Sequence, residues 1–246
     1  MKVYTLLTIG DFHTNHCEDF LINEKIGSHK KLIAVLDGCT MGKESVFAAI
    51  LGGKLLRKIA KKYFYEELVH QESKILKEEL KQILQEFFSE LKLAKNQLQL
   101  EINEMLCTLI IGLIDESTSK AEFLTVGDGL IYFDGELTEY DQGDQPDYLA
   151  YHLDKDFESW YDPQKQILFL SCFSDLSICT NGVFTFKNLR DLSKQIAEHE
   201  IVHYLLNDHS YAEFDTMLEQ KLTFLRDVRD HVVTDDLAIV RVINKL

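Results

Sequence analysis

The feature that most constrains the fold is a short apolar run that ends in a carboxylate. Residues 32–36 read Leu-Ile-Ala-Val-Leu and are followed directly by Asp37 and Gly38. A short continuous apolar run is typical of a strand that is buried on both faces. Asp37 is then expected at the end of this strand, where Gly38 lets another group approach the backbone closely. Such a pair suits a hard cation such as Mg²⁺ or Mn²⁺, and it also suits a simple Asp-Gly turn.

Two long amphipathic helices are predicted after this strand. Thr40 offers an N-cap, and a helical pattern with apolar residues at every fourth position begins near Gly42. A second pattern spans residues 70–95, with leucines and a phenylalanine on one side. Because only a short break separates the two patterns, we expect an antiparallel helix pair laid on a sheet.

The rest of the chain is predicted to be rich in strands. Residues 3–9 form a first strand, and residues 105–140 form an antiparallel meander with a hairpin turn at Asp134-Gly135. Residues 141–165 are polar and carry both prolines, so we expect a surface loop there. Two more strands, helices over residues 187–226 and a last strand follow. This order predicts an α+β domain with antiparallel sheets and helices on their outer faces.

Composition narrows the classes of function. The 246 residues include 26 Lys and Arg against 41 Asp and Glu, which gives a net charge of −15. Such a surface repels nucleic-acid phosphates and anionic lipid, so we expect no nucleic-acid partner and no membrane partner. No apolar run approaches the roughly 18 residues that a membrane span needs. Without an evident linker, we expect a single domain over residues 1–246 and a monomer.

The cysteines and the N-terminus point to a reducing compartment. The chain has five cysteines, an odd number, and no Cys-x-x-Cys pair. No charged and then apolar leader follows Met1, so we expect a cytoplasmic protein. Cys39 lies close to Asp37 in the sequence, where either a buried inert thiol or an oxidisable one fits the pattern.

Polar groups recur where the predicted strands begin or end. Residues 13–19 bring together two histidines, a cysteine and two carboxylates, which fits either a metal site or an exposed polar loop. Asp128 lies in a predicted turn, where an Asx turn and a site role fit equally well. Six acidic or amide positions of this kind could meet on one rim of a sandwich of sheets: Glu18, Asp19, Asp37, Asp128, Asn181 and Asp235.

Taken in order, these motifs resemble those of the metal-dependent protein phosphatases, the type-2C Ser/Thr phosphatases. The resemblance rests on the short motifs HCEDF, AVLDG, VGDG, ICTNGV and TDDLAIVRV, and it spans roughly residues 5–243. It implies a four-layer α-β-β-α sandwich, in which two antiparallel sheets are flanked by pairs of helices. It assigns the metal-ligand positions to Glu18, Asp19, Asp37, Gly38, Asp128, Asn181 and Asp235.

The resemblance also implies a reaction and its cofactors. Members of the family use two Mg²⁺ or Mn²⁺ ions to activate water against a phosphate monoester, and a third ion can bind at the position of Asp128. Oxygen ligands favour these hard ions over zinc. No protein nucleophile is needed, which agrees with the lack of a serine elbow or a Cys-x5-Arg loop in the sequence. The expected partner is a phosphoprotein substrate that carries phosphoserine or phosphothreonine.

Departures from the family pattern concern the second metal and the phosphate. Asn181 stands where the family has an aspartate, and the loss of one negative charge should weaken the second metal. The phosphate-gripping arginine of the family corresponds to Thr14 here. His13 or His16 could donate to phosphate as an imidazolium, although His16 alone fits a surface histidine better. Lys43, at a predicted helix start, is another candidate phosphate contact.

Two functions therefore compete. One is an active Mg²⁺- or Mn²⁺-dependent protein phosphatase, which the retained acidic positions favour. The other is a phosphatase-fold binding or regulatory module with weakened catalysis, which Asn181 and Thr14 favour. A third reading is an unrelated α+β protein whose aspartates only form turns. Metal binding separates the third reading from the first two, and turnover separates the first from the second.

Overall fold

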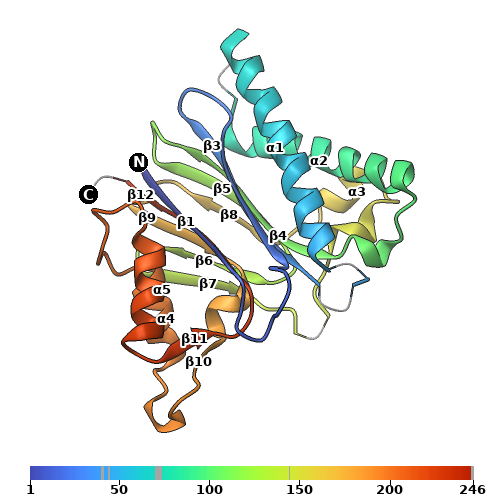
Figure 1. Ribbon diagram of the computed structural model, residues 1–246. Helices are drawn as coiled ribbons and strands as arrows, with labels where there is room; N and C mark the ends of the chain where they lie inside the picture. Colours follow the sequence, from blue (N-terminus) through green and yellow to red (C-terminus); the bar gives the residue numbers. More distant parts are fainter. Residues whose placement is uncertain (40–41, 44, 70–73, 144, 245–246) are drawn as a thin grey trace.

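The computed structural model describes residues 1–39, 42–43, 45–69, 74–143 and 145–244. Its centre is a pair of five-stranded antiparallel sheets that face each other (Figure 1). The first sheet contains, in spatial order, β2 (Asp19–Lys25), β3 (Lys30–Gly38), β4 (Cys107–Asp115), β5 (Lys120–Val126) and β8 (Ile167–Leu170). The second contains β1 (Lys2–Thr8), β12 (Leu237–Ile243), β9 (Asp175–Cys179), β6 (Gly129–Phe133) and β7 (Glu136–Tyr140). A small separate pairing joins β10 (Phe186–Asn188) and β11 (His231–Val233).

Helices cover the outer face of each sheet (Figure 1). The first sheet carries α1 (Ser45–Val69) and α2 (Leu76–Leu98), and the second carries α4 (Glu198–Leu206) and α5 (Met217–Asp227). Shorter helical elements are α3 (Phe157–Tyr161), η1 (Ile102–Glu104), η2 (Leu149–His152), η3 (Asn181–Phe184) and η4 (Leu192–Lys194). None of the helices in the described residues is long and apolar enough to cross a membrane.

Strand β3 shows how the layers are held together. Its alternate residues Leu32 and Leu36 pack under α1 and α2, whereas Ile33 and Val35 pack between the two sheets. All four side chains are almost fully buried, as expected for a strand that contributes to two cores. A third core lies between the second sheet and the helices α4 and α5. The predicted four-layer α-β-β-α sandwich is therefore confirmed.

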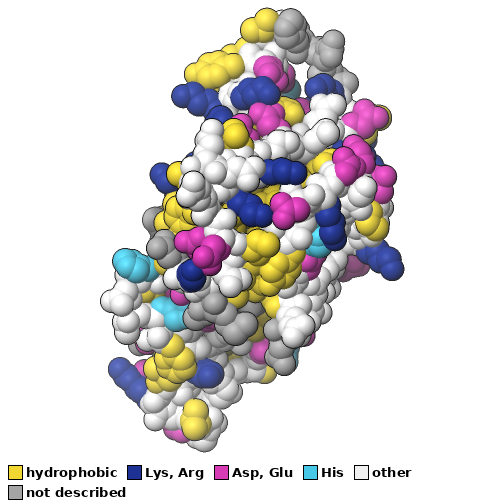
Figure 2. All heavy atoms as spheres, turned by 90° about the vertical axis from the view of Figure 1, so that its right-hand side faces the viewer, with side chains coloured by type: hydrophobic (Ala, Val, Ile, Leu, Met, Phe, Trp, Pro, Cys, Tyr) yellow, Lys and Arg dark blue, Asp and Glu magenta, His cyan; other side chains and the backbone are white. Residues whose placement is uncertain are grey.

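The outer face of α1 and α2 is charged and solvated. Figure 2, which looks onto the side of the molecule that carries these helices, shows Lys and Arg side chains interspersed with Asp and Glu. Lys58 and Lys62 of α1 lie 2.7 and 2.9 Å from Glu90 and Glu86 of α2. Because exposed pairs of this kind contribute only about 0–1 kcal/mol, the packing of α1 depends mainly on its buried face.

That buried face approaches the first sheet very closely at Gly53. A Cβ atom at this position would lie 2.1 Å from Cδ1 of the Phe20 ring on β2. We expect Gly53→Ala to destabilise the fold by about 1–3 kcal/mol, because the helix must move away from the sheet. Urea unfolding would measure this, with Lys54→Ala at the neighbouring exposed position as the control. A Gly53→Ala protein as stable as the wild type would contradict the close packing.

The predicted meander over residues 105–140 is wrong in its connectivity. β4 and β5 pair in the first sheet, whereas β6 and β7 form a hairpin in the second. The chain crosses between the sheets at Gly127 and Gly129, whose φ angles of 81° and 141° favour glycine. Asp128 therefore lies at a crossing between sheets. The hairpin turn at Asp134-Gly135 is confirmed, with φ angles of 46° and 92°.

The surface loop predicted over residues 141–165 is also wrong. The segment contains η2 and α3, and its residues Tyr148, Leu153 and Trp160 are buried in the helical core. The Trp160 ring centroid lies 5.7 Å from that of Phe88 on α2. Buried apolar residues recur here at every fourth position, at Leu149, Leu153, Phe157 and Tyr161, but the polar composition and the two prolines dominated the prediction.

The helix boundaries differ from the predicted ones. Instead of helices throughout residues 187–226, the chain first forms β10 and η4, and only then α4 and α5. The second of the two long helices, predicted over residues 70–95, is α2 and begins at Leu76. The described part of α1 begins at Ser45, and the predicted N-cap Thr40 lies outside the described residues.

Candidate metal centre

One edge of the double sheet gathers the ends of five strands. β1, β3 and β9 end at this edge, and β2 and β12 begin there, because their pairings are antiparallel. The residues that flank these ends are polar, and they include Asp19, Asp37, Thr180 and Asp236. This edge is therefore the candidate functional site.

Asp19 and Asp37 place two carboxylates side by side at the site. They stand opposite each other in the pairing of β2 with β3. Asp19 is only 3% exposed, and Thr180 Oγ1 donates a hydrogen bond of 2.7 Å to its Oδ2 atom. Its Oδ1 atom is buried without a hydrogen-bond partner among the described residues. A buried carboxylate oxygen without a partner is costly unless a proton or a cation satisfies it.

The two carboxylates have unusual pKa values. Burial, followed by the negative charge of Asp37, raises the pKa of Asp19 well above its ordinary value. Burial, followed by the charge of Asp235, raises the pKa of Asp37 to about 7. A bound cation would relieve both the repulsion between neighbouring negative charges and the loss of hydration. This donor set of carboxylate oxygens fits a hard divalent cation.

Glu18 is held beside them by the start of α1. Ser45 Oγ donates to Glu18 Oε1 at 2.6 Å, and Gly38 N donates to the Glu18 carbonyl at 3.1 Å. A Cβ atom on Gly38 would lie 2.1 Å from the Ser45 carbonyl oxygen. The Asp-Gly pair therefore allows the first turn of α1 to pack directly against the end of β3.

Asp235 and Asp236 approach the same edge from the start of β12. Asp236 is 3% exposed and accepts hydrogen bonds from the backbone N–H groups of Gly10, at 2.8 Å, and Glu18. His13 lies beside both aspartates, with Nδ1 2.9 Å from Asp236 Oδ2 and Nε2 3.5 Å from Asp235 Oδ1. The Nδ1 contact is within ion-pair distance but lacks hydrogen-bond geometry. Burial lowers the pKa of His13, but the carboxylates, led by Asp236, raise it overall.

Three predicted site residues lie apart from these carboxylates. The Asp128 carboxylate accepts a hydrogen bond of 2.7 Å from Gln142 N. Asn181 is exposed at the start of η3, and Lys43 is exposed and pairs with Glu101 at 2.6 Å. In the described part of the chain, no hydrogen bond or ion pair joins these three to Asp19 or Asp37.

The structure therefore gathers part of the predicted set. It brings Glu18, Asp19, Asp37, Gly38 and Asp235 to one edge, together with His13. Within the described residues, however, no three His, Cys, Asp or Glu side chains are placed to hold one ion. The predicted histidine His16 is exposed, as is Thr14, which occupies the position of the arginine of the family.

Sequence reasoning missed three residues that organise the site: Thr180, Ser45 and Asp236. Thr180 and Ser45 donate to the site carboxylates, and Asp236 binds the backbone of the loop between β1 and β2. The Asp235-Asp236 doublet was a signal for the last of these, but only Asp235 was assigned a role. Hydrogen bonds across 161 or 226 positions leave no local pattern in a sequence.

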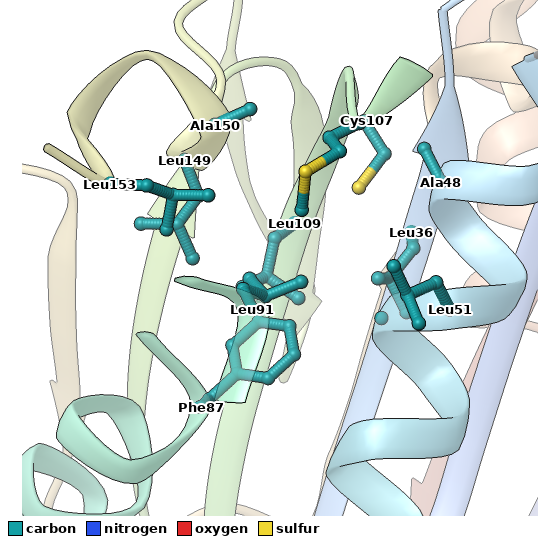
Figure 3. Close-up of a pocket in the computed structure, with 12 residues that line it drawn as sticks. Leu36, Ala48, Leu51, Phe87, Leu91, Cys107, Leu109, Leu149, Ala150 and Leu153 are labelled. Carbon is teal, nitrogen blue, oxygen red and sulfur yellow. The ribbon is translucent and has the colours of Figure 1, made fainter. Parts of the chain in front are cut away.

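An apolar hollow lies inside the molecule between α1, α2 and the strands β3 and β4 (Figure 3). Its described lining residues carry no charge, so the hollow is unsuited to phosphate or to a metal ion. The side chains that point toward it include Leu36, Ala48, Leu51, Phe87, Leu91, Cys107 and Leu149. The chemistry of the site therefore belongs to the strand edge.

The fold is similar to those of solved phosphatases. Serine/threonine phosphatase Stp1 from Staphylococcus aureus matches with a TM-score of 0.62 and 12% identity, over 100% of this chain and 96% of that chain. The catalytic domain of the serine threonine protein phosphatase PstP, in complex with two manganese ions, matches with a TM-score of 0.60 and 14% identity, over 98% and 96%. RsbX in complex with magnesium matches with a TM-score of 0.51 and 17% identity, over 97% and 92%. At these identities the likeness establishes the fold.

The family follows from the sequence comparison. A search of curated proteins found no match. The family model described as Protein phosphatase 2C matches residues 13–225. This match covers most of the chain and includes the segments that carry Asp19 and Asp37. The chain therefore belongs to the protein phosphatase 2C family.

Proposed function

We propose that this chain is a Mg²⁺- or Mn²⁺-dependent phosphatase that acts on phosphoserine and phosphothreonine in proteins. Membership of the family supports the class of reaction. The manganese in the PstP structure and the magnesium in the RsbX structure support the choice of cation for this fold. When bound, a pair of such ions supplies Lewis-acid activation of water for attack on the phosphate.

The observation that carries the proposal is the unpartnered oxygen of Asp19. Its Oδ1 atom is buried, has no donor among the described residues, and belongs to a carboxylate that faces Asp37 across the strand pair. A purely structural aspartate would be expected to accept hydrogen bonds at both of its oxygens, as Asp236 does. The geometry of Asp19 thus supports a cation as its missing partner.

The residues of the chain have separable tasks in this proposal. Five of them would hold the cations at the strand edge, with Gly38 contributing its carbonyl oxygen; they are Glu18, Asp19, Asp37, Gly38 and Asp235. Asp128 and Asn181 would complete the set for a weaker second or third ion. His13, which Asp235 and Asp236 orient, donates to a phosphate oxygen of the substrate. Lys43 would first have to leave Glu101, so we rank it behind His13 as a phosphate contact.

The proposal is tested by hydrolysis of para-nitrophenyl phosphate and of a phosphothreonine peptide with and without Mn²⁺. Turnover that depends on Mn²⁺ and disappears in Asp37→Asn supports it. A wild type that binds Mn²⁺ in calorimetry but does not turn over either substrate would identify a binding module instead. Absence of Mn²⁺ binding in calorimetry would overturn the proposal altogether.

Restoring a carboxylate at position 181 should strengthen the metal centre. We expect Asn181→Asp to bind Mn²⁺ roughly tenfold more tightly, because a negative charge is added at the exposed position that follows Thr180, the residue that donates to Asp19. Phosphatase activity at limiting Mn²⁺ should rise with it. Isothermal titration calorimetry measures the affinity, and Asn96→Asp on the exposed part of α2 adds the same charge elsewhere. Equal affinities in the two variants would argue against a metal role for position 181.

A further inference from the structure

Asp236 makes contacts that the metal chemistry does not require. It is 3% exposed, yet neither of its oxygens is free. Oδ1 accepts a hydrogen bond of 2.8 Å from Gly10 N, and Oδ2 accepts one from Glu18 N and lies 2.9 Å from His13 Nδ1. Asp236, which directly precedes β12, therefore binds the backbone at both ends of the loop formed by residues 10–18.

This double attachment needs a carboxylate. Two backbone N–H groups approach different oxygens of Asp236, and both oxygens must accept. An asparagine has a single acceptor oxygen, so its NH₂ group would face either the N–H of Gly10 or that of Glu18. A buried backbone N–H without an acceptor is unfavourable, so the loop should move until this group reaches water.

The backbone around Asp236 guides the same loop. Asp11 N and Phe12 N donate to the carbonyls of Val233 and Thr234 at 2.9 and 3.1 Å, which extends the pairing of the two chain ends beyond β1 and β12. A Cβ atom on Gly10 would lie 2.3 Å from the carbonyl carbon of Asp235, so glycine is required for this approach. The loop then delivers Glu18 directly before Asp19.

We propose that Asp236 is a positioning residue of the metal centre, which holds the loop of residues 10–18 closed so that Glu18 and His13 face Asp19 and Asp37. This inference rests on the proposed function, because the cation is what the positioned groups serve. Asp236 itself is not placed among the ligands, since both of its oxygens are already used. Removal of its carboxylate should open the loop without removing any predicted ligand.

The test compares Mn²⁺ affinity and amide hydrogen exchange in wild type and variants. We expect Asp236→Asn to weaken Mn²⁺ binding about 10–100-fold, the range typical for loss of an outer-shell partner. The amides of Gly10 and Glu18 should exchange faster with solvent in the metal-free variant, while those of the paired strands β3 and β4 remain protected. Exchange in the metal-free protein does not depend on activity.

Two further variants separate positioning from charge. Gly10→Ala displaces the same loop by a steric route and leaves the net charge unchanged, so it should also weaken Mn²⁺ binding and speed exchange at Glu18. Asp11→Asn removes a carboxylate from an exposed position of the same loop and should bind Mn²⁺ like the wild type. The double variant Gly10→Ala, Asp236→Asn should bind Mn²⁺ only slightly more weakly than either single variant, because both changes disrupt the same attachment of the loop.

The outcomes distinguish this inference from the proposed function. A wild type that binds no Mn²⁺ overturns both. Mn²⁺ binding in the wild type that is unchanged in Asp236→Asn, with unchanged exchange at Glu18, overturns only the positioning role. Weakened binding in Asp236→Asn with normal binding in Gly10→Ala would show that the charge of Asp236 acts directly, and this too overturns it.

Discussion

Asp37→Asn should abolish Mn²⁺-dependent phosphatase activity and, at the same time, stabilise the metal-free protein. The carboxylate is the proposed centre of the metal site. Its loss should therefore lower activity by more than the factor of about 10–100 that is typical for loss of an outer-shell partner. In the metal-free protein, however, loss of hydration, followed by the negative charge of Asp235, raises the free-energy cost of ionising the same group. An amide of the same shape removes that cost.

The pH dependence follows from the pKa of Asp37, which is raised to about 7. In the unfolded chain this group ionises near 3.9, so between about pH 4 and 7 the native protein binds more protons than the unfolded one. The stability of the metal-free wild type should therefore fall as the pH rises through this window and level off above pH 7. At pH 8 we expect Asp37→Asn to be more stable by on the order of 1–4 kcal/mol, because each pKa unit corresponds to about 1.36 kcal/mol.

Mn²⁺ should reverse this order of stability. A cation competes with the proton for Asp37, so wild-type affinity should increase up to about pH 7, and binding then stabilises the native state by mass action. Thermal unfolding of both proteins, with EDTA and with excess Mn²⁺, at pH 5 and at pH 8, measures these effects. A metal-free Asp37→Asn protein that is no more stable than wild type at pH 8 would contradict the proposed electrostatic strain.

The layers of the fold were predictable because each strand and helix carries a local pattern. The apolar run of residues 32–36 showed a doubly buried strand, and the structure places its alternate residues in two different cores. Connectivity was harder to predict. The crossing at Asp128 depends on two glycines with positive φ, and the sequence pattern around it is the same for a hairpin and for a change of sheet. The buried residues within 141–165 were missed because the polar composition and the two prolines outweighed their apolar spacing.

The site was predictable only as a set of residue types at strand ends. The resemblance selected Asp19, Asp37 and Asp235, which the structure brings to one edge. The residues that hold this edge together act through long-range backbone hydrogen bonds, as Asp236 does with Gly10. Such a role depends on which segments meet in the folded state, and neither composition nor periodicity reports that.

Replacing Arg241 should give the largest loss of stability, because its guanidinium group is the centre of a buried ion-pair network. The side chain is fully buried on β12, where Nε and Nη2 donate to the two oxygens of Asp175 at 3.0 and 2.5 Å. Its other N–H groups bind carbonyl oxygens at the C-terminal end of α4, those of Leu205, Asn207 and Asp208. These carbonyls have no partner within the helix and attract positive charge.

Lys221 of α5 completes this network from the other side. Its side chain is fully buried, and its Nζ donates to the carbonyls of Tyr204 and Asp208, each at 2.5 Å. Two buried cations thus satisfy the end of α4 and connect it to α5 and to the second sheet. The His209 ring also reaches Asp175, with 2.9 Å between Nε2 and Oδ2. The network therefore joins the outer helical layer to the second sheet through polar contacts.

We expect Arg241→Met to lower the free energy of unfolding by about 3–5 kcal/mol, because it removes the guanidinium from a buried, charged Asp175 and leaves only the His209 ring, among the described side chains, to pair with it. The double variant Arg241→Met, Asp175→Leu should recover part of this loss, since it also removes the buried carboxylate that has lost its main partner. Arg241→Lys keeps the charge but cannot bind both Asp175 oxygens and the end of α4 together. Its free energy of unfolding should therefore lie between those of Arg241→Met and the double variant. Urea unfolding of the three variants measures the series. A loss below about 1 kcal/mol in Arg241→Met would place this pair with exposed salt bridges and contradict its role at the end of α4.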